Sequence, residues 1–257
     1  MFKALMQENE SVLKGLLCSL LSLKEDDIVS TEITNSIILG DDITDKTFML
    51  DVCLRLNDSQ IINLEMQVID YHNWTERSLA YLGREFSKIL KGDDYENATP
   101  VHQIGILNFT LFEEHPMFYS TYMMQELKNH HIYSDKFAIS VLDLTQIDKA
   151  TVDDKARKLD QWARLFSAKT WEDLTMLTKE NPIMADAVET LQNLTDDDAI
   201  SAACYRRDLH MKYEAYVQRK LKEQADELKQ KSDEINQQAN EIAELKRLLA
   251  EERAKNN

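Results

Sequence analysis

The feature that most constrains the fold is a pair of alternating segments separated by a short turn. Apolar side chains occupy the even positions of residues 48–56 and again the even positions of residues 62–68. A period of two is the spacing of a β-strand that buries one face. The turn residues Asn57, Asp58 and Ser59 lie between the two segments. The sequence therefore predicts a β-hairpin whose even-numbered residues face the core.

Two carboxylates of the hairpin, Asp51 and Glu65, occupy odd positions and so leave the face opposite the apolar one. With Asp58 at the centre of the turn they lie directly opposite each other, and Gln67 shares their face. Carboxylates that face each other repel, and a divalent cation between them removes that repulsion. Oxygen ligands of this kind suit Mg²⁺ or Mn²⁺. The alternative is the solvated face of an amphipathic hairpin, where acids are common.

Two nearby features count against a purely solvated face. Four other side chains on this face are apolar, namely Met49, Cys53, Ile61 and Ile69. A helix predicted over residues 73–91 follows and carries a basic stripe, at about 100° per residue, of Arg77, Arg84, Lys88 and Lys91. In a chain of net charge −16, this stripe is the best candidate for phosphate contact. A solvated helix face with intrahelical ion pairs is the alternative for the stripe.

The rest of the chain predicts a mixed α/β domain followed by helices. Strand patterns cover residues 27–39, 101–112 and 137–144, helical spacing covers residues 10–23, and the patterns are helical from about residue 151 onward. We therefore expect an α/β domain over 1–150, a helical extension over 151–207 and a coiled-coil-like C-terminal helix over 208–257.

The C-terminal helix carries a heptad pattern. The chain has no Gly or Pro between residues 199 and 255. Within this stretch, five apolar residues recur every seven positions: Leu221, Leu228, Ile235, Ile242 and Leu249. A seam of this kind is typical of a coiled coil, so we expect residues 211–257 to form homo-oligomers. A solvated single helix is the alternative, because the seam is thin.

Composition excludes several other classes. The net charge of −16 argues against broad attraction to nucleic acid or anionic membrane without a local basic patch. No apolar run approaches 18 residues, so no membrane span is expected, and the charged N-terminal pattern predicts a helix instead of a signal peptide. The scattered Cys18, Cys53 and Cys204 predict neither a zinc site nor a disulfide framework and suit a reducing cytoplasm.

The order of these elements resembles the PD-(D/E)xK nuclease superfamily, and most closely the Rpn family of recombination-promoting nucleases and putative transposases. The matching segments are FKALMQENESVLKGLL at 2–17, LDV at 50–52, LEMQ at 64–67, ERSLAYLGREFSKILKGDDY at 76–95, PVHQIGILNFTLF at 100–112, DQWARLF at 160–166 and PIMADAVETLQNL at 182–194. The resemblance covers roughly residues 1–210.

This resemblance implies a restriction-endonuclease-like mixed sheet flanked by helices, and a Mg²⁺-dependent DNA endonuclease linked to recombination or transposition. It makes Asp51 and Glu65 the metal ligands and places Gln67 at the superfamily's lysine position, where many members of this family carry Gln. It also implies that an acid of the first helix, Glu8 or Glu10, joins the site.

The expected chemistry is phosphodiester hydrolysis, in which a metal polarises the phosphate and activates a water that Gln67 orients. The basic stripe would hold flanking phosphates. A rival hypothesis is a catalytically degenerate nuclease-like domain that acts as an interaction or oligomerisation protein. The acidic charge balance and the neutral Gln67 favour the rival, whereas the set of Asp51, Glu65 and Gln67 favours the enzyme.

Overall fold

The computed structural model describes residues 2–34, 37–38, 48–49, 52–88, 94–179 and 181–196, together with residues 213, 216–217, 219–238, 240, 242 and 246. The chain divides into two units, Met1–Cys204 and Tyr205–Asn257. The first unit contains the sheet and the helices that cover it, and the second is a helical tail.

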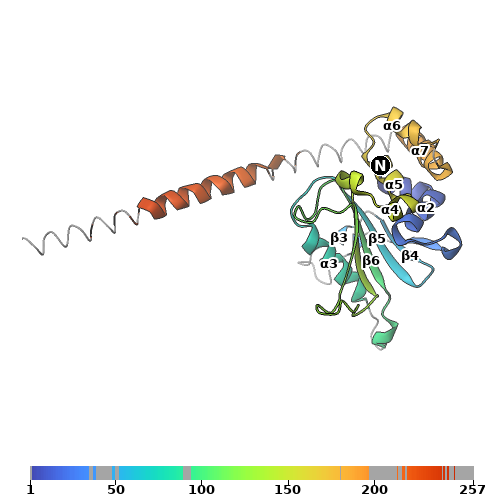
Figure 1. The fold of residues 1–257 in the computed structure, drawn as a ribbon, viewed down its shortest axis with the longest axis horizontal. Helices are drawn as coiled ribbons and strands as arrows, with labels where there is room; N and C mark the ends of the chain where they lie inside the picture. The colour runs from blue at the N-terminus through green and yellow to red at the C-terminus, as the bar shows by residue number, and fades with distance from the viewer. Residues whose placement is uncertain are drawn as a thin grey trace, which may run out of the picture. The chain divides into compact units, whose positions relative to one another are not determined.

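A six-stranded mixed sheet forms the centre of the first unit (Figure 1). Its strands, in spatial order, are β1 (Thr31–Thr34), β4 (Val52–Leu56), β5 (Gln60–Gln67), β6 (Val101–Leu107), β8 (Phe137–Asp143) and β7 (Tyr119–Met123). The central strands β5, β6 and β8 are parallel, and the remaining pairs are antiparallel. A separate antiparallel pair joins β2 (Ile37–Ile38) to β3 (Phe48–Met49). The predicted mixed α/β fold is confirmed.

The β4–β5 hairpin has the predicted register. Val52 pairs with Leu64 and Leu56 pairs with Gln60, so the centre of the turn is Asp58. Three residues, 57–59, connect the strands, and Asn57 and Asp58 adopt left-handed φ values of 50° and 53°, which Asn and Asp tolerate better than most residues. The Asn57 side chain also accepts a hydrogen bond from the Val29 amide at 2.8 Å, which ties the turn to the chain ahead of β1.

The even-numbered face of β4 and β5 holds the main core. The helices on this side of the sheet are α1 (Phe2–Glu8), α2 (Glu10–Leu21), α4 (Val152–Ala156), α5 (Leu159–Ser167), α6 (Trp171–Leu177) and α7 (Pro182–Asp196) (Figure 1). Val52 and Leu64 are buried in this core and Met66 packs against it, as predicted, while Leu50 lies outside the described residues. The Trp162 indole N–H donates to Ser19 Oγ at 3.0 Å and joins α5 to α2 inside the core.

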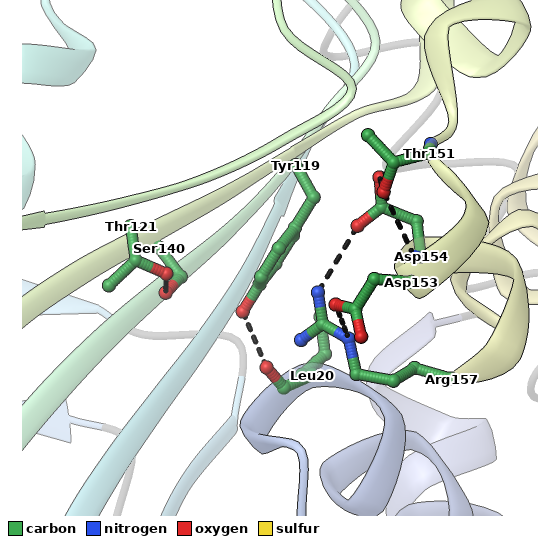
Figure 2. Close-up of polar contacts among 8 residues, drawn as sticks. All are labelled: Leu20, Tyr119, Thr121, Ser140, Thr151, Asp153, Asp154 and Arg157. Carbon is green, nitrogen blue, oxygen red and sulfur yellow. Dashed lines mark hydrogen bonds and ion pairs between the residues drawn. The ribbon is translucent and has the colours of Figure 1, made fainter.

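A polar cluster fastens the helices to the edge of the sheet (Figure 2). The Tyr119 hydroxyl on β7 donates to the Leu20 carbonyl at the end of α2, at 2.5 Å. Arg157 lies over the Tyr119 ring, 5.1 Å from its centre, and forms ion pairs with Asp153 and Asp154 at 3.0 and 3.1 Å. Burial raises the pKa of Tyr119, so this hydroxyl stays a hydrogen-bond donor across the physiological range.

Among the described residues, the helix α3 (Trp74–Phe86) covers the odd-numbered face. Tyr81 of α3 packs with Cys53 and Ile61, and the resulting burial raises the pKa of the Cys53 thiol. Trp74 packs with Leu107 and Val141. The two faces of the sheet therefore meet different partners, a layer of several helices on one side and α3 on the other.

Several boundaries differ from the prediction. α3 ends at Phe86 instead of residue 91, and β6 ends at Leu107 instead of residue 112. The pattern over 27–39 divides into β1 and β2. Strand β7 was not predicted because it lies at the edge of the sheet, where its side chains are only partly buried and carry a weak apolar signal. The described part of the unit also contains short 3₁₀ helices, η1 (Glu25–Asp27), η2 (Tyr95–Asn97) and η3 (Leu144–Lys149).

In the second unit, the described residues between 213 and 246 are helical. The heptad residues Leu221, Leu228, Ile235 and Ile242 are between 52% and 68% exposed in the single chain. A coiled coil is therefore not shown, and the predicted association stays a prediction. Within the part of the chain that the structure describes, no helix is both long and apolar enough to cross a membrane.

Candidate active site

A layer of polar side chains lies between the central strands and α3. On β5 the layer contains Asn63, Glu65 and Gln67, which share the odd-numbered face. On β6, Gln103 pairs with Asn63 and Gly105 pairs with Glu65. These four polar side chains are at most 6% exposed, which is unusual for their residue types and marks the layer as a candidate functional site.

Glu65 is 3% exposed and forms an ion pair with Arg77 of α3, from Arg77 Nη2 to Glu65 Oε1. The Arg77 guanidinium is itself held by Tyr81, one helical turn further on. Arg77 Nε donates to the Tyr81 hydroxyl at 3.1 Å, and the guanidinium carbon lies 5.3 Å from the centre of the Tyr81 ring. A buried carboxylate needs such a cation nearby, because desolvation would otherwise destabilise its charged form.

Gln67 lies at the end of β5, on the same side of the sheet as Glu65. Its Nε2 donates to the Ile69 carbonyl at 2.8 Å, which fixes the orientation of the amide. Its Oε1 is buried and accepts no hydrogen bond from any residue that the structure describes. An oriented carbonyl oxygen with an open acceptor position can bind a water molecule or a cation.

The predicted partner of Glu65, Asp51, lies outside the described residues. The described pairing ends with Val52 opposite Leu64. Within the described ranges, no group of three or more His, Cys, Asp or Glu side chains has the geometry of a metal site. The convergence of Asp51 with Glu65 thus stays a prediction, whereas Glu65 and Gln67 do share one face.

Two residues of the predicted basic stripe pair with buried acids. Arg77 pairs with Glu65, and Lys88 Nζ pairs with Glu85 Oε1 at 2.7 Å. The Arg84 side chain is partly buried, and Lys91 lies outside the described residues. Two of the four predicted phosphate contacts therefore neutralise carboxylates in the structure, and their role toward DNA stays a prediction.

Glu85 was missed by the sequence analysis. It is 4% exposed and belongs to the buried stripe of α3, at positions 74, 78, 81, 82 and 85. The helical spacing of this stripe could have revealed an acid among core positions. Like Glu65, which pairs with Arg77 of α3, Glu85 is a buried carboxylate paired with a cation, in this case Lys88, which follows the end of α3.

The first-helix acids do not join this layer. Glu8 and Glu10 are exposed on α1 and α2, the helices that pack on the opposite, even-numbered face. Glu10 pairs with Lys14 at 3.0 Å, and the hydrogen bond and charge of Lys14 lower its pKa. The structure thus places both acids away from the face of Glu65, because the apolar stripes of their helices pack against the other side of the sheet.

The donor set of the layer fits a hard divalent cation. The Glu65 carboxylate and the amide oxygens of Gln67 and Asn63 are oxygen ligands of the kind that Mg²⁺ and Mn²⁺ prefer. The buried, open acceptor of Gln67 is the observation that points to such a group.

Comparison with known proteins agrees with this arrangement. The family model described as PD-(D/E)XK nuclease family transposase matches residues 1–224. No curated protein and no solved structure matches the chain significantly. The mixed sheet with flanking helices is consistent with the restriction-endonuclease-like α/β fold. With most of its length matched by that model, the chain belongs to the PD-(D/E)XK nuclease family transposases.

Proposed function

We propose that this protein is a divalent-metal-dependent DNA endonuclease, linked to DNA recombination or transposition, whose centre consists of Asp51, Glu65 and Gln67. The observation that carries the proposal is the buried Glu65 carboxylate, with the open Gln67 oxygen on the same face of β5. Continuing the observed β4–β5 register by one residue would pair Asp51 with Glu65. Membership of the nuclease family supports hydrolysis of phosphodiester bonds as the chemistry.

In this proposal Asp51 and Glu65 hold the cation, Mg²⁺ or Mn²⁺. The bound cation supplies Lewis-acid activation of the phosphate and lowers the pKa of a water molecule. Gln67 Oε1 would accept a hydrogen bond from the attacking water, and the hydrogen bond that Gln67 Nε2 donates to the Ile69 carbonyl holds that oxygen in position. Because Gln67 is neutral, it orients the water without removing its proton.

The DNA backbone would bind along α3 and the residues that follow it in the chain, through Arg77, Arg84, Lys88 and Lys91. Arg77 is the central member, because its guanidinium already lies beside Glu65 and could bind a phosphate oxygen there. Such contacts position DNA without reading its sequence. A cytoplasmic location belongs to the same proposal, and the described cysteines Cys18 and Cys53 are free thiols, as a reducing compartment would keep them.

A second candidate function is an interaction protein that uses a degenerate nuclease domain. The exposed heptad residues of the tail favour it, because an exposed apolar seam on a helix is typically covered by a partner helix. Divalent-cation affinity separates the two candidates. The enzyme requires affinity for a divalent cation, and the Asp51→Ala variant should lose that affinity. The interaction protein needs no such affinity.

The test is cleavage of supercoiled plasmid by purified protein with Mg²⁺ or Mn²⁺, and with EDTA as the metal-free control. Asp51→Ala and Glu65→Gln should abolish cleavage, while circular dichroism shows the fold intact. Glu32→Gln is the matched control, because Glu32 is an exposed acid on β1 of the same sheet. Equal cleavage by the wild type and Asp51→Ala, from clean preparations, would show that the activity does not come from this site.

A further inference from the structure

We propose that Asn63 and Gln103 are positioning residues of the metal centre, whose side-chain amides hold the water ligands of the divalent cation beside Glu65. The inference rests on the proposed nuclease function and extends its site by two residues that neither the motif nor the family description assigns.

The two amides lie side by side on adjacent parallel strands. Asn63 on β5 and Gln103 on β6 are paired in the sheet register, so their side chains leave the same face. Asn63 is two residues before Glu65 on that face, and Gln103 is two residues before Gly105, the register partner of Glu65. Both amides therefore lie next to Glu65 on this face of the sheet, two residues back along their strands.

Both amides are completely buried and carry open hydrogen-bonding atoms. Asn63 and Gln103 are 0% exposed. Neither the oxygen nor the nitrogen of either side chain has a hydrogen-bond partner among the residues that the structure describes. Two further atoms on this side of the sheet share that condition, Gln67 Oε1 and the indole Nε1 of Trp74.

Buried polar atoms without partners are costly, and the great majority in folded proteins are paired with protein or with ordered water. Leu or Met at these positions would fill similar volume with no polar atom to satisfy. Here the unpaired atoms gather in one layer, beside a buried acid, instead of being scattered through the core. This clustering indicates a polar occupant of the layer.

A hydrated divalent cation fits the layer better than other ligand classes. An apolar ligand would leave every amide atom unpaired, and an anion would lie close to the Glu65 carboxylate. Mg²⁺ usually keeps several of its water ligands, and these waters donate hydrogen bonds. The amide oxygens of Asn63 and Gln103 can accept them, and the amide nitrogens can donate to oxygens of the same hydrated cluster.

The experiment measures two quantities on the full-length protein, the binding of MgCl₂ and MnCl₂ by titration calorimetry and the urea midpoint of unfolding in EDTA. The test variants are Asn63→Leu and Gln103→Met, which remove the amides at similar volume. Asn181→Leu is the matched control, because Asn181 is a buried amide whose atoms are paired, with Gln161 Oε1 and with the Ile183 amide, both at 3.1 Å.

Each test variant should bind the cation about 10- to 100-fold more weakly, the range seen when groups behind the metal ligands are removed. Its midpoint in EDTA should be unchanged or higher, since unpaired buried atoms have been removed. The control should show the opposite pattern, with a lower midpoint and unchanged affinity. A solely structural role would lower the midpoint of the test variants and leave their affinity unchanged.

The inference is overturned if either test variant folds and binds the cation as tightly as the wild type. If one test variant does not fold, the result for the other one decides. The proposed function is tested separately by Glu65→Gln. If the wild type binds no cation, or Glu65→Gln binds it equally well, the proposed function and this inference both fail. If the wild type binds through Glu65 but the amide variants bind equally well, the inference alone fails.

Discussion

Replacing Gly105 with Ala should destabilise the protein by crowding Trp74. Gly105 on β6 is the register partner of Glu65, and the Trp74 ring of α3 occupies the space that a Cβ of residue 105 would need. A Cβ at this position would lie 2.3, 2.7 and 3.0 Å from three atoms of the Trp74 ring. Ordinary carbon contacts are about 3.5–4.0 Å, so the indole would have to retreat by about 1 Å.

The magnitude follows from two opposing effects. Overpacking of a buried site costs about 1–3 kcal/mol, and a Trp ring packed with Leu107 and Val141 has little room to move. Ala in place of Gly also stabilises the folded state by about 0.4–1 kcal/mol, because it lowers the conformational entropy of the unfolded chain. The net expectation is a loss of about 1–2 kcal/mol, which lowers Tm by about 2–4 °C per kcal/mol in a unit of this size.

The assay is urea unfolding followed by Trp fluorescence, because all three Trp residues lie in the first unit. Gly83→Ala is the matched control on α3, where an added Cβ meets no described atom within 4 Å. Its helix-interior position predicts a gain of about 0.5–1 kcal/mol. The reasoning is refuted if Gly105→Ala is as stable as Gly83→Ala, since the two substitutions differ chiefly in the space around the new methyl group.

Two further predictions concern acid stability and assembly. His102 is buried against the Ser140 hydroxyl, 2.8 Å from its Nε2, and burial lowers its pKa to about 4. The unfolded state, with a His pKa of about 6.5, therefore binds the extra proton between pH 6.5 and pH 4, and stability falls by up to ~3 kcal/mol as pH drops through that window. His102→Asn should flatten this part of the curve of unfolding free energy against pH, and an unchanged slope would assign the acid sensitivity to other groups. Deleting residues 211–257 should lower the number of chains per particle, obtained as the light-scattering mass divided by the mass of one chain, and also the ratio of linear to nicked plasmid. An unchanged number of chains and an unchanged ratio would identify the tail as a solvated helix.

The hairpin could be predicted from the sequence because its determinants are local. The period of two assigns each residue to a face, and the Asn57–Asp58 turn sets the register. These two facts alone place Glu65 and Gln67 together, opposite the apolar core. The family resemblance, confirmed over residues 1–224, likewise depends on motifs that can be seen along the chain.

Only the tertiary structure decided what surrounds Glu65. The sequence marked Arg77 as basic, but its ion pair with Glu65 depends on where α3 crosses the sheet. The same crossing places Glu85 among buried positions, and the packing of α1 and α2 on the other face keeps Glu8 and Glu10 away.

Asn63 and Gln103 show most clearly why the sequence alone could not reveal the neighbours of Glu65. Asn63 and Gln103 are 40 residues apart, and they become neighbours only because β5 and β6 pair in parallel, a pairing that requires the α3 crossover between them. Periodicity assigns a residue to a face of its own strand, but it does not say which strand lies beside it or which helix covers it. Those choices are made by long-range packing, so the sequence by itself determined the face of Glu65, and the tertiary structure decided its neighbours.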